Sequence, residues 1–128
     1  MALALLSEEV RTLPILASGA TRLGGDFLLG DGYWNTRIVR YDAEGEFLME
    51  WGEEGTLLGQ FNEPHALAMD SRGRLFVADR MNQRIQVFDL DRGEEILQRD
   101  GFCGFIQGAE GIWLGGVIGE VIKAENIR

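Results

Sequence analysis

The chain has 128 residues, of which 45% are hydrophobic, and it carries a formal net charge of −9. This length and composition fit one small folded domain and exclude a wholly disordered chain. The acidic balance argues against partners such as nucleic acid or an anionic membrane surface, the lone cysteine excludes an internal disulfide, and no apolar run reaches the roughly 20 residues of a membrane span.

Residues 1–24 fit no strand of the repeat that follows, so we expect them to be a partial or irregular segment. The apolar run at residues 1–6 has no basic leader, and Ser7 with two glutamates ends it. It is therefore not expected to be a signal peptide, and the compartment stays open. Ser7 followed by acidic residues is instead a candidate start of a short helix.

Two stretches of the chain repeat one pattern of residues. Asp31 is followed by Asn-Thr-Arg-Ile at 35–38 and by Tyr-Asp at 41–42, and Asp79 is followed by Asn-Gln-Arg-Ile at 82–85 and by Phe-Asp at 88–89. The offset is 48 residues at the first aspartate and 47 afterwards, so the first copy has one extra turn residue. Agreement of several residue types in one order indicates an internal repeat.

Each copy predicts short strands joined by polar turns. In the first copy, residues 25–56, we expect strands at 27–29, 37–41 and 46–51, which make an incomplete sheet. In the second copy, residues 57–100, we expect strands at 65–69, 74–78, 84–88 and 95–98. Polar and apolar residues alternate at 84–88, so one face of that strand packs on a neighbouring sheet. The pattern predicts antiparallel four-stranded sheets with little helix.

Residues 101–128 leave two interpretations open, a degenerate third repeat or an irregular tail. Residues 112–116 align with 75–79 at an offset of 37, and residues 120–123 align with 84–87 at an offset of 36. This spacing is about ten residues shorter than the first one, and Gly116 takes the place of the repeated aspartate.

The stretch 59–89 resembles the NHL repeat, which has a Gly-x-Phe…Pro entry, a strand ending in Val-Ala-Asp, and an Asn-x-Arg-Ile-x-Val-Phe-Asp strand. Within that superfamily, residues 25 to 90 look most like the peptidyl-α-hydroxyglycine α-amidating lyases. The closer match lies in Asp31-Gly32-Tyr33, Pro64-His65 and Ala78-Asp79-Arg80, with further agreement at 34–39 and 51–55. The resemblance implies an all-β fold of NHL-type blades, a fragment of a six-bladed β-propeller, in a family whose members are often secreted.

The resemblance also implies a zinc enzyme that cleaves a peptidyl-α-hydroxyglycine into a peptide amide and glyoxylate. His65 matches one of three metal-binding histidines, Tyr33 matches a tyrosine that acts on the substrate hydroxyl, and Arg80 matches an arginine that handles substrate charge. Zinc is a Lewis acid, a phenol near it loses its proton below its ordinary pKa of about 10, and arginine holds carboxylates in a fixed fork.

This sequence departs from that family in its number of histidines. A catalytic zinc needs about three protein ligands, and His65 is the single histidine. We therefore expect the isolated chain to be inactive and not to hold zinc tightly. The alternative function is a non-catalytic NHL propeller scaffold that binds a protein or a small ligand.

The length predicts an incomplete propeller. Closed rings use four or more blades of about 40–45 residues, so we expect a fragment, a truncated product or part of an assembly. Uncovered faces of the end blades then predict self-association or loose folding.

Each candidate site residue also has a structural interpretation. His65 is a structural or solvent-facing histidine, Tyr33 is an aromatic that packs on its neighbours, and Arg80 pairs with an acidic group such as Asp79. If the functional interpretation holds, the three side chains lie on one rim of the propeller, within reach of one small substrate.

The two repeated aspartates, in contrast, are predicted to be structural. Asp31 recurs with Arg37 and Asp79 recurs with Arg84, at the same place in each copy. Aspartate side chains bond nearby backbone amides in turns. We therefore expect both aspartates to fix the turn that follows them.

Overall fold

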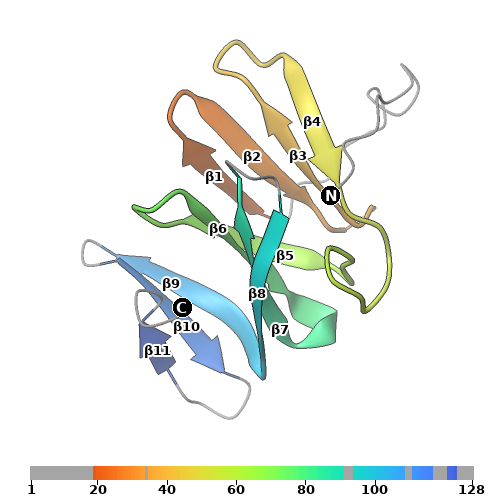
Figure 1. Ribbon diagram of the computed structural model, residues 1–128, viewed down its shortest axis with the longest axis vertical. Helices are drawn as coiled ribbons and strands as arrows, with labels where there is room; N and C mark the ends of the chain where they lie inside the picture. Colours follow the sequence, from red (N-terminus) through yellow and green to blue (C-terminus); the bar gives the residue numbers. More distant parts are fainter. Residues whose placement is uncertain (1–18, 34, 91–93, 109–110, 117–120, 124–128) are drawn as a thin grey trace.

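The computed structural model describes residues 19–33, 35–90, 94–108, 111–116 and 121–123, and the side chains of residues 19–33, 35–90, 100–101 and 123. Within these ranges the chain forms three antiparallel sheets and one 3₁₀ turn, η1 (Arg80–Asn82) (Figure 1). The predicted helix near Ser7 and the rest of the predicted irregular segment before residue 19 lie outside the described residues.

The first two sheets are four-stranded, and each places its strands in chain order. The first sheet consists of β1 (Gly19–Leu23), β2 (Asp26–Asp31), β3 (Arg37–Tyr41) and β4 (Phe47–Trp51). The second consists of β5 (Pro64–Met69), β6 (Arg74–Asp79), β7 (Arg84–Asp89) and β8 (Glu94–Asp100). This up-and-down order in antiparallel four-stranded sheets is the organisation of propeller blades, and it confirms the predicted all-β fold.

The prediction of an incomplete first sheet that starts at residue 25 is wrong, because β1 completes the sheet from Gly19 onward. The sequence of β1, Gly-Ala-Thr-Arg-Leu, has little β-propensity of its own, so it forms a strand through its pairing with β2 and its packing on β5. A Cβ at Gly19 would lie 2.8 Å from the carbonyl oxygen of His65, so glycine permits this close approach of the two blades.

The third sheet has the order β11-β10-β9, with β9 (Phe102–Gly108), β10 (Gly111–Gly116) and β11 (Val121–Lys123). The expectation of an irregular tail is therefore wrong for these described ranges, and the alternative, a degenerate third repeat, agrees with the strands at 111–116 and 121–123. The first strand of this sheet, β9, contacts β5, β6 and β7 of the second sheet.

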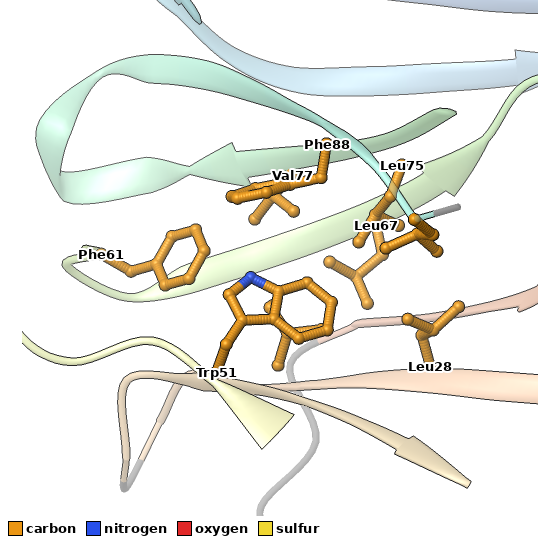
Figure 2. Packing of buried hydrophobic residues seen from close by; sticks show 9 residues of the cluster. Leu28, Trp51, Phe61, Leu67, Leu75, Val77 and Phe88 are labelled. Atoms are coloured by element: carbon orange, nitrogen blue, oxygen red, sulfur yellow. The ribbon is translucent and has the colours of Figure 1, made fainter. Parts of the chain in front are cut away.

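A hydrophobic core fills the space between the first two sheets. The first sheet supplies Leu28, Ile38 and Trp51, and the second blade faces them with Phe61, Leu67, Leu75, Val77 and Phe88 (Figure 2). The ring centroid of Trp51 lies 5.6 Å from that of Phe88, and the centroid of Phe61 lies 6.0 Å from it. Each fully buried side chain of this size stabilises the fold by about 1.5–3 kcal/mol, so this core joins the two blades.

The repeated aspartates hold the turns at the ends of β2 and β6, as predicted. Asp31 is fully buried and accepts hydrogen bonds from Asn35 (2.6 Å) and Arg37 (2.9 Å). The second copy repeats this arrangement, because Asp79 accepts from Asn82 (2.8 Å) and Arg84 (2.8 Å). One carboxylate in each blade therefore gathers the polar groups of its turn.

The arginines of the two copies differ in their other partners. Burial by itself lowers the pKa of Arg37, but hydrogen bonds to Asp31 and Glu50 raise it above its ordinary value overall. Arg84 instead donates to the backbone carbonyls of Thr56, Leu57 and Gln60, and so binds the loop that enters the second blade.

Candidate functional site

Tyr33 lies just beyond β2, in the turn that Asp31 fixes. The residue is 49% exposed. Its hydroxyl oxygen lies 3.1 Å from Nε2 of His65, and the two rings meet edge to face with centroids 5.8 Å apart. The tautomer of the imidazole decides whether the phenol donates or accepts in this hydrogen bond. The contact joins the first blade to the second across 32 residues of sequence.

His65 is the second residue of β5 and lies at a β-bulge. Pro64 pairs with Asp79 and Ala66 pairs with Ala78, so His65 is the extra residue on the bulged strand. Bulges bend a strand and redirect a side chain, and they are frequent beside active sites. His65 has no partner residue in the register of β5 with β6, and its half-buried imidazole lies against Tyr33.

Arg80 begins η1 directly after β6, and its side chain is 52% exposed. Its Nη1 atom lies 3.4 Å from Oε1 of Glu63, and its backbone N–H donates to the carbonyl oxygen of Glu63 at 3.2 Å. The acidic residue that pairs with Arg80 is therefore Glu63 and not Asp79, which accepts hydrogen bonds from Arg84 and Asn82. Glu63 was missed at the sequence level; its place directly before the Pro64-His65 pair was the available signal.

Strand register brings the three predicted residues to one end of the blades. Pro64 opposes Asp79, so the start of β5 with His65 lies at the end of β6, which Arg80 follows. Tyr33 reaches the same end from the first blade through its contact with His65. The structure therefore places Tyr33 against His65 and puts Arg80 at the same end of the blades. The reach of one substrate across all three stays a prediction.

The described residues do not by themselves make a zinc site. No group of three or more histidine, cysteine, aspartate and glutamate side chains in the described part of the chain is arranged to hold a metal ion. A catalytic zinc takes about three protein ligands, and His65 can supply one nitrogen. The remaining ligands of a zinc site would have to come from outside these residues.

A shallow hollow lies next to this rim but does not include Tyr33, His65 or Arg80. It is lined by Asn35, Thr36, Arg37, Glu50, Gly52, Glu53 and Glu54. Arg37 and Glu50 form an ion pair within it, and Glu53 accepts a hydrogen bond from Gln60 at 2.9 Å. These polar groups hold the turn and the loop together, so the hollow is separate from the candidate site.

One family of sequence repeats matches the second blade. The sequence model of the NHL repeat matches residues 61–88, which run from Phe61 through β7. The four-stranded antiparallel sheets have the fold of β-propeller blades, and the part of the chain that matches the NHL repeat lies in the second of them.

Similarity to individual proteins is more specific. Over 79 residues the chain is 47% identical to peptidyl-glycine alpha-amidating monooxygenase B of Xenopus laevis, an alignment that covers 58% of the chain and 9% of that protein. It is 39% identical over 79 residues to peptidyl-alpha-hydroxyglycine alpha-amidating lyase 1 of Drosophila melanogaster, an alignment that covers 54% of the chain and 14% of that protein. It is 49% identical over 65 residues to NHL repeat-containing protein 3 of Homo sapiens (51% and 19%). The matched part of the chain thus spans less than a fifth of each of these relatives.

Solved structures share the fold at low sequence identity. A putative exported protein of Bacteroides fragilis superimposes with a TM-score of 0.67 at 12% identity, over 93% of this chain and 39% of that one. Virginiamycin B lyase of Staphylococcus aureus superimposes with a TM-score of 0.54 at 14% identity, over 82% and 39%. Similarity at these identities shows the fold alone.

Within the described ranges, no helix has the length and apolar character needed to cross a membrane.

Proposed function

We propose that the chain supplies part of the active site of a peptidyl-α-hydroxyglycine α-amidating lyase, which would release glyoxylate and leave a peptide amide. The observation that carries the proposal is the 3.1 Å contact between the Tyr33 hydroxyl and the His65 imidazole, made between two blades on the rim that Arg80 shares. The similarity of the chain to amidating lyases supports it.

In this proposal Tyr33 acts as the general base. As a phenolate, its oxygen takes the proton of the substrate hydroxyl, the C–O bond becomes the carbonyl of glyoxylate, and the electron pair of the C–N bond passes to the amide nitrogen. The proton held by the resulting phenol then passes to that nitrogen, which restores the phenolate and balances the reaction. The hydrogen bond with Nε2 of His65 holds the phenol oxygen in place, because the oxygen is otherwise at the tip of a half-exposed side chain.

Arg80 is the group that binds the carboxylate of the hydroxyglycine. Its half-exposed guanidinium is accessible to a ligand and offers the planar donor fork that carboxylates match. Zinc, when bound, would polarise an oxygen of the substrate as a Lewis acid, and His65 is the ligand that this chain would contribute, through the ring nitrogen that does not contact Tyr33. Peptides that end in α-hydroxyglycine are the substrates that this arrangement predicts.

The test is release of glyoxylate from a synthetic peptidyl-α-hydroxyglycine by the protein expressed over its whole reading frame with zinc. We expect Tyr33→Phe to lower kcat by about 10²-fold or more, because it removes the group that takes the proton. Tyr41→Phe is the matched control, because it makes the same change at the end of β3 that lies away from Tyr33. This variant should retain activity. Zinc-loaded protein that releases no glyoxylate would exclude the lyase proposal.

A second candidate function is a scaffold without catalytic activity that binds a protein or small ligand on the same rim. The 49% identity to NHL repeat-containing protein 3, whose name states no activity, supports it. Folded, zinc-loaded protein that is inactive in the glyoxylate assay would favour this alternative.

Self-association through uncovered blade faces also stays a prediction, with sedimentation as its measurement.

A further inference from the structure

Glu63 has an unusual backbone conformation beside the candidate site. Its φ is 61°, and Gln83 is the other non-glycine residue with a positive φ in the described part of the chain. Left-handed backbone is uncommon for a residue such as glutamate, and such conformations are frequent at ligand-binding sites. The residue lies directly before Pro64 and two positions before His65, so its conformation bears on the rim itself.

Backbone hydrogen bonds fix this position whether or not the Glu63 side chain makes a contact. The N–H of Arg80 donates to the carbonyl oxygen of Glu63 at 3.2 Å, and the N–H of Met81 donates to that of Asn62 at 3.0 Å. The N–H of Asn62 in turn donates to the buried carboxylate of Asp79 at 2.6 Å. The entry to β5 is therefore tied to η1, which keeps the backbone of Glu63 next to that of Arg80.

The ion pair between these two side chains is, in contrast, a weak one. The nitrogen–oxygen distance is 3.4 Å, and the side chains of Arg80 and Glu63 are 52% and 25% exposed. Exposed pairs of this kind shift an equilibrium by a factor of about five or less. A carboxylate ligand of ordinary strength can therefore displace Glu63 from Arg80.

We propose that Glu63 is an internal carboxylate that occupies Arg80 in the free protein and that a ligand carboxylate must displace. The inference rests on the proposed function in taking Arg80 as the group that binds a carboxylate. It makes Glu63 a residue that sets the affinity for ligands with a terminal carboxylate and leaves the chemical step unchanged. Removal of its charge tightens binding, whereas removal of a residue that merely orients Arg80 would weaken it.

The experiment measures binding of N-acetylglycine to the full chain by ligand-observed saturation-transfer NMR. This probe carries an acylated glycine carboxylate but no hydroxyl, so it cannot be cleaved, and the method works whether or not the chain associates. We expect Glu63→Gln to lower the Kd by about two- to fivefold, the range of an exposed ion pair. Arg80→Gln should abolish binding.

Two further variants make the result decisive. Glu44→Gln makes the same change in net charge in the exposed turn between β3 and β4, at the opposite end of the blade, and should leave the Kd unchanged. Glu63→Gly removes the carboxylate and also adopts a positive φ without strain, so it should tighten binding as Glu63→Gln does. An unchanged or higher Kd in both Glu63 variants would overturn the inference, as would absence of binding to the wild-type chain.

The outcome is separable from that of the lyase proposal. Tighter binding of N-acetylglycine in Glu63→Gln, combined with no release of glyoxylate by the zinc-loaded protein, would remove the lyase activity and retain Glu63 as the competing carboxylate. Release of glyoxylate, combined with weaker binding in both Glu63 variants, would retain the activity and remove the inference. In an active protein, Glu63→Gln should lower KM and leave kcat unchanged.

Discussion

Removal of the Asp79 carboxylate should destabilise the second blade more than any surface substitution. Asp79 is fully buried and accepts hydrogen bonds from Arg84 Nε (2.8 Å), Asn82 Nδ2 (2.8 Å) and the backbone N–H of Asn62 (2.6 Å). The Arg84 side chain is 5% exposed. Asp79→Ala therefore leaves a buried guanidinium without its counter-charge.

The magnitude follows from the partners that Arg84 retains. Breaking a buried ion pair by removing one member costs about 3–5 kcal/mol. Arg84 still donates from Nη1 to the carbonyl oxygen of Thr56 (2.8 Å) and from Nη2 to those of Leu57 (3.0 Å) and Gln60 (2.7 Å), so both of these nitrogens keep acceptors while Nε loses Asp79. We therefore expect a loss near the lower limit, about 3 kcal/mol in the free energy of unfolding. Asp79→Asn, which keeps an acceptor oxygen but no charge, should cost about 1–3 kcal/mol.

Urea unfolding measures these differences. With a slope of about 1–3 kcal/mol per molar urea, Asp79→Ala should lower the midpoint by about 1–3 M. The exposed control Glu44→Ala should change the free energy of unfolding by about 0.5 kcal/mol or less. The double variant of Asp79→Ala with Arg84→Met should recover part of the loss, because no buried charge then remains. A loss in Asp79→Ala as small as that of Glu44→Ala would refute the reasoning.

Two further predictions concern the first blade. Gly19→Ala should destabilise the chain by about 1–3 kcal/mol in the same urea assay, because its Cβ would lie 2.8 Å from the carbonyl oxygen of His65, a backbone atom that cannot rotate away; a neutral effect would show that β1 does not pack there. Burial raises the pKa of Tyr41 above 10.0, so the folded state holds this proton more tightly than the unfolded state, and the free energy of unfolding should fall as the pH rises above 10.0. Tyr41→Phe should lessen this alkaline loss, and an identical loss in both proteins would contradict the assignment.

The residues of the candidate site and their common rim were predictable from the sequence, but the contacts that they make were not. Tyr33, His65 and Arg80 were identified through short matches to a family. Glu63 had only its place directly before the Pro64-His65 pair as a signal, and its contact with Arg80 joins two residues that are 17 positions apart in the sequence. The bulge at His65 was not predictable from the sequence either, because a bulge is defined by the register of the partner strand.

Most strands of the two blades follow from the local sequence, because the forces that define them act over a few residues. Short β-rich runs between polar turns set these strands, and the aspartates Asp31 and Asp79 reach arginines only six and five positions away to close their turns. Tertiary structure alone decided that β1 is a strand and that Tyr33 meets His65 across 32 residues. Those features depend on how one blade packs against the next, and burial between sheets leaves no local periodicity in the segments that it brings together.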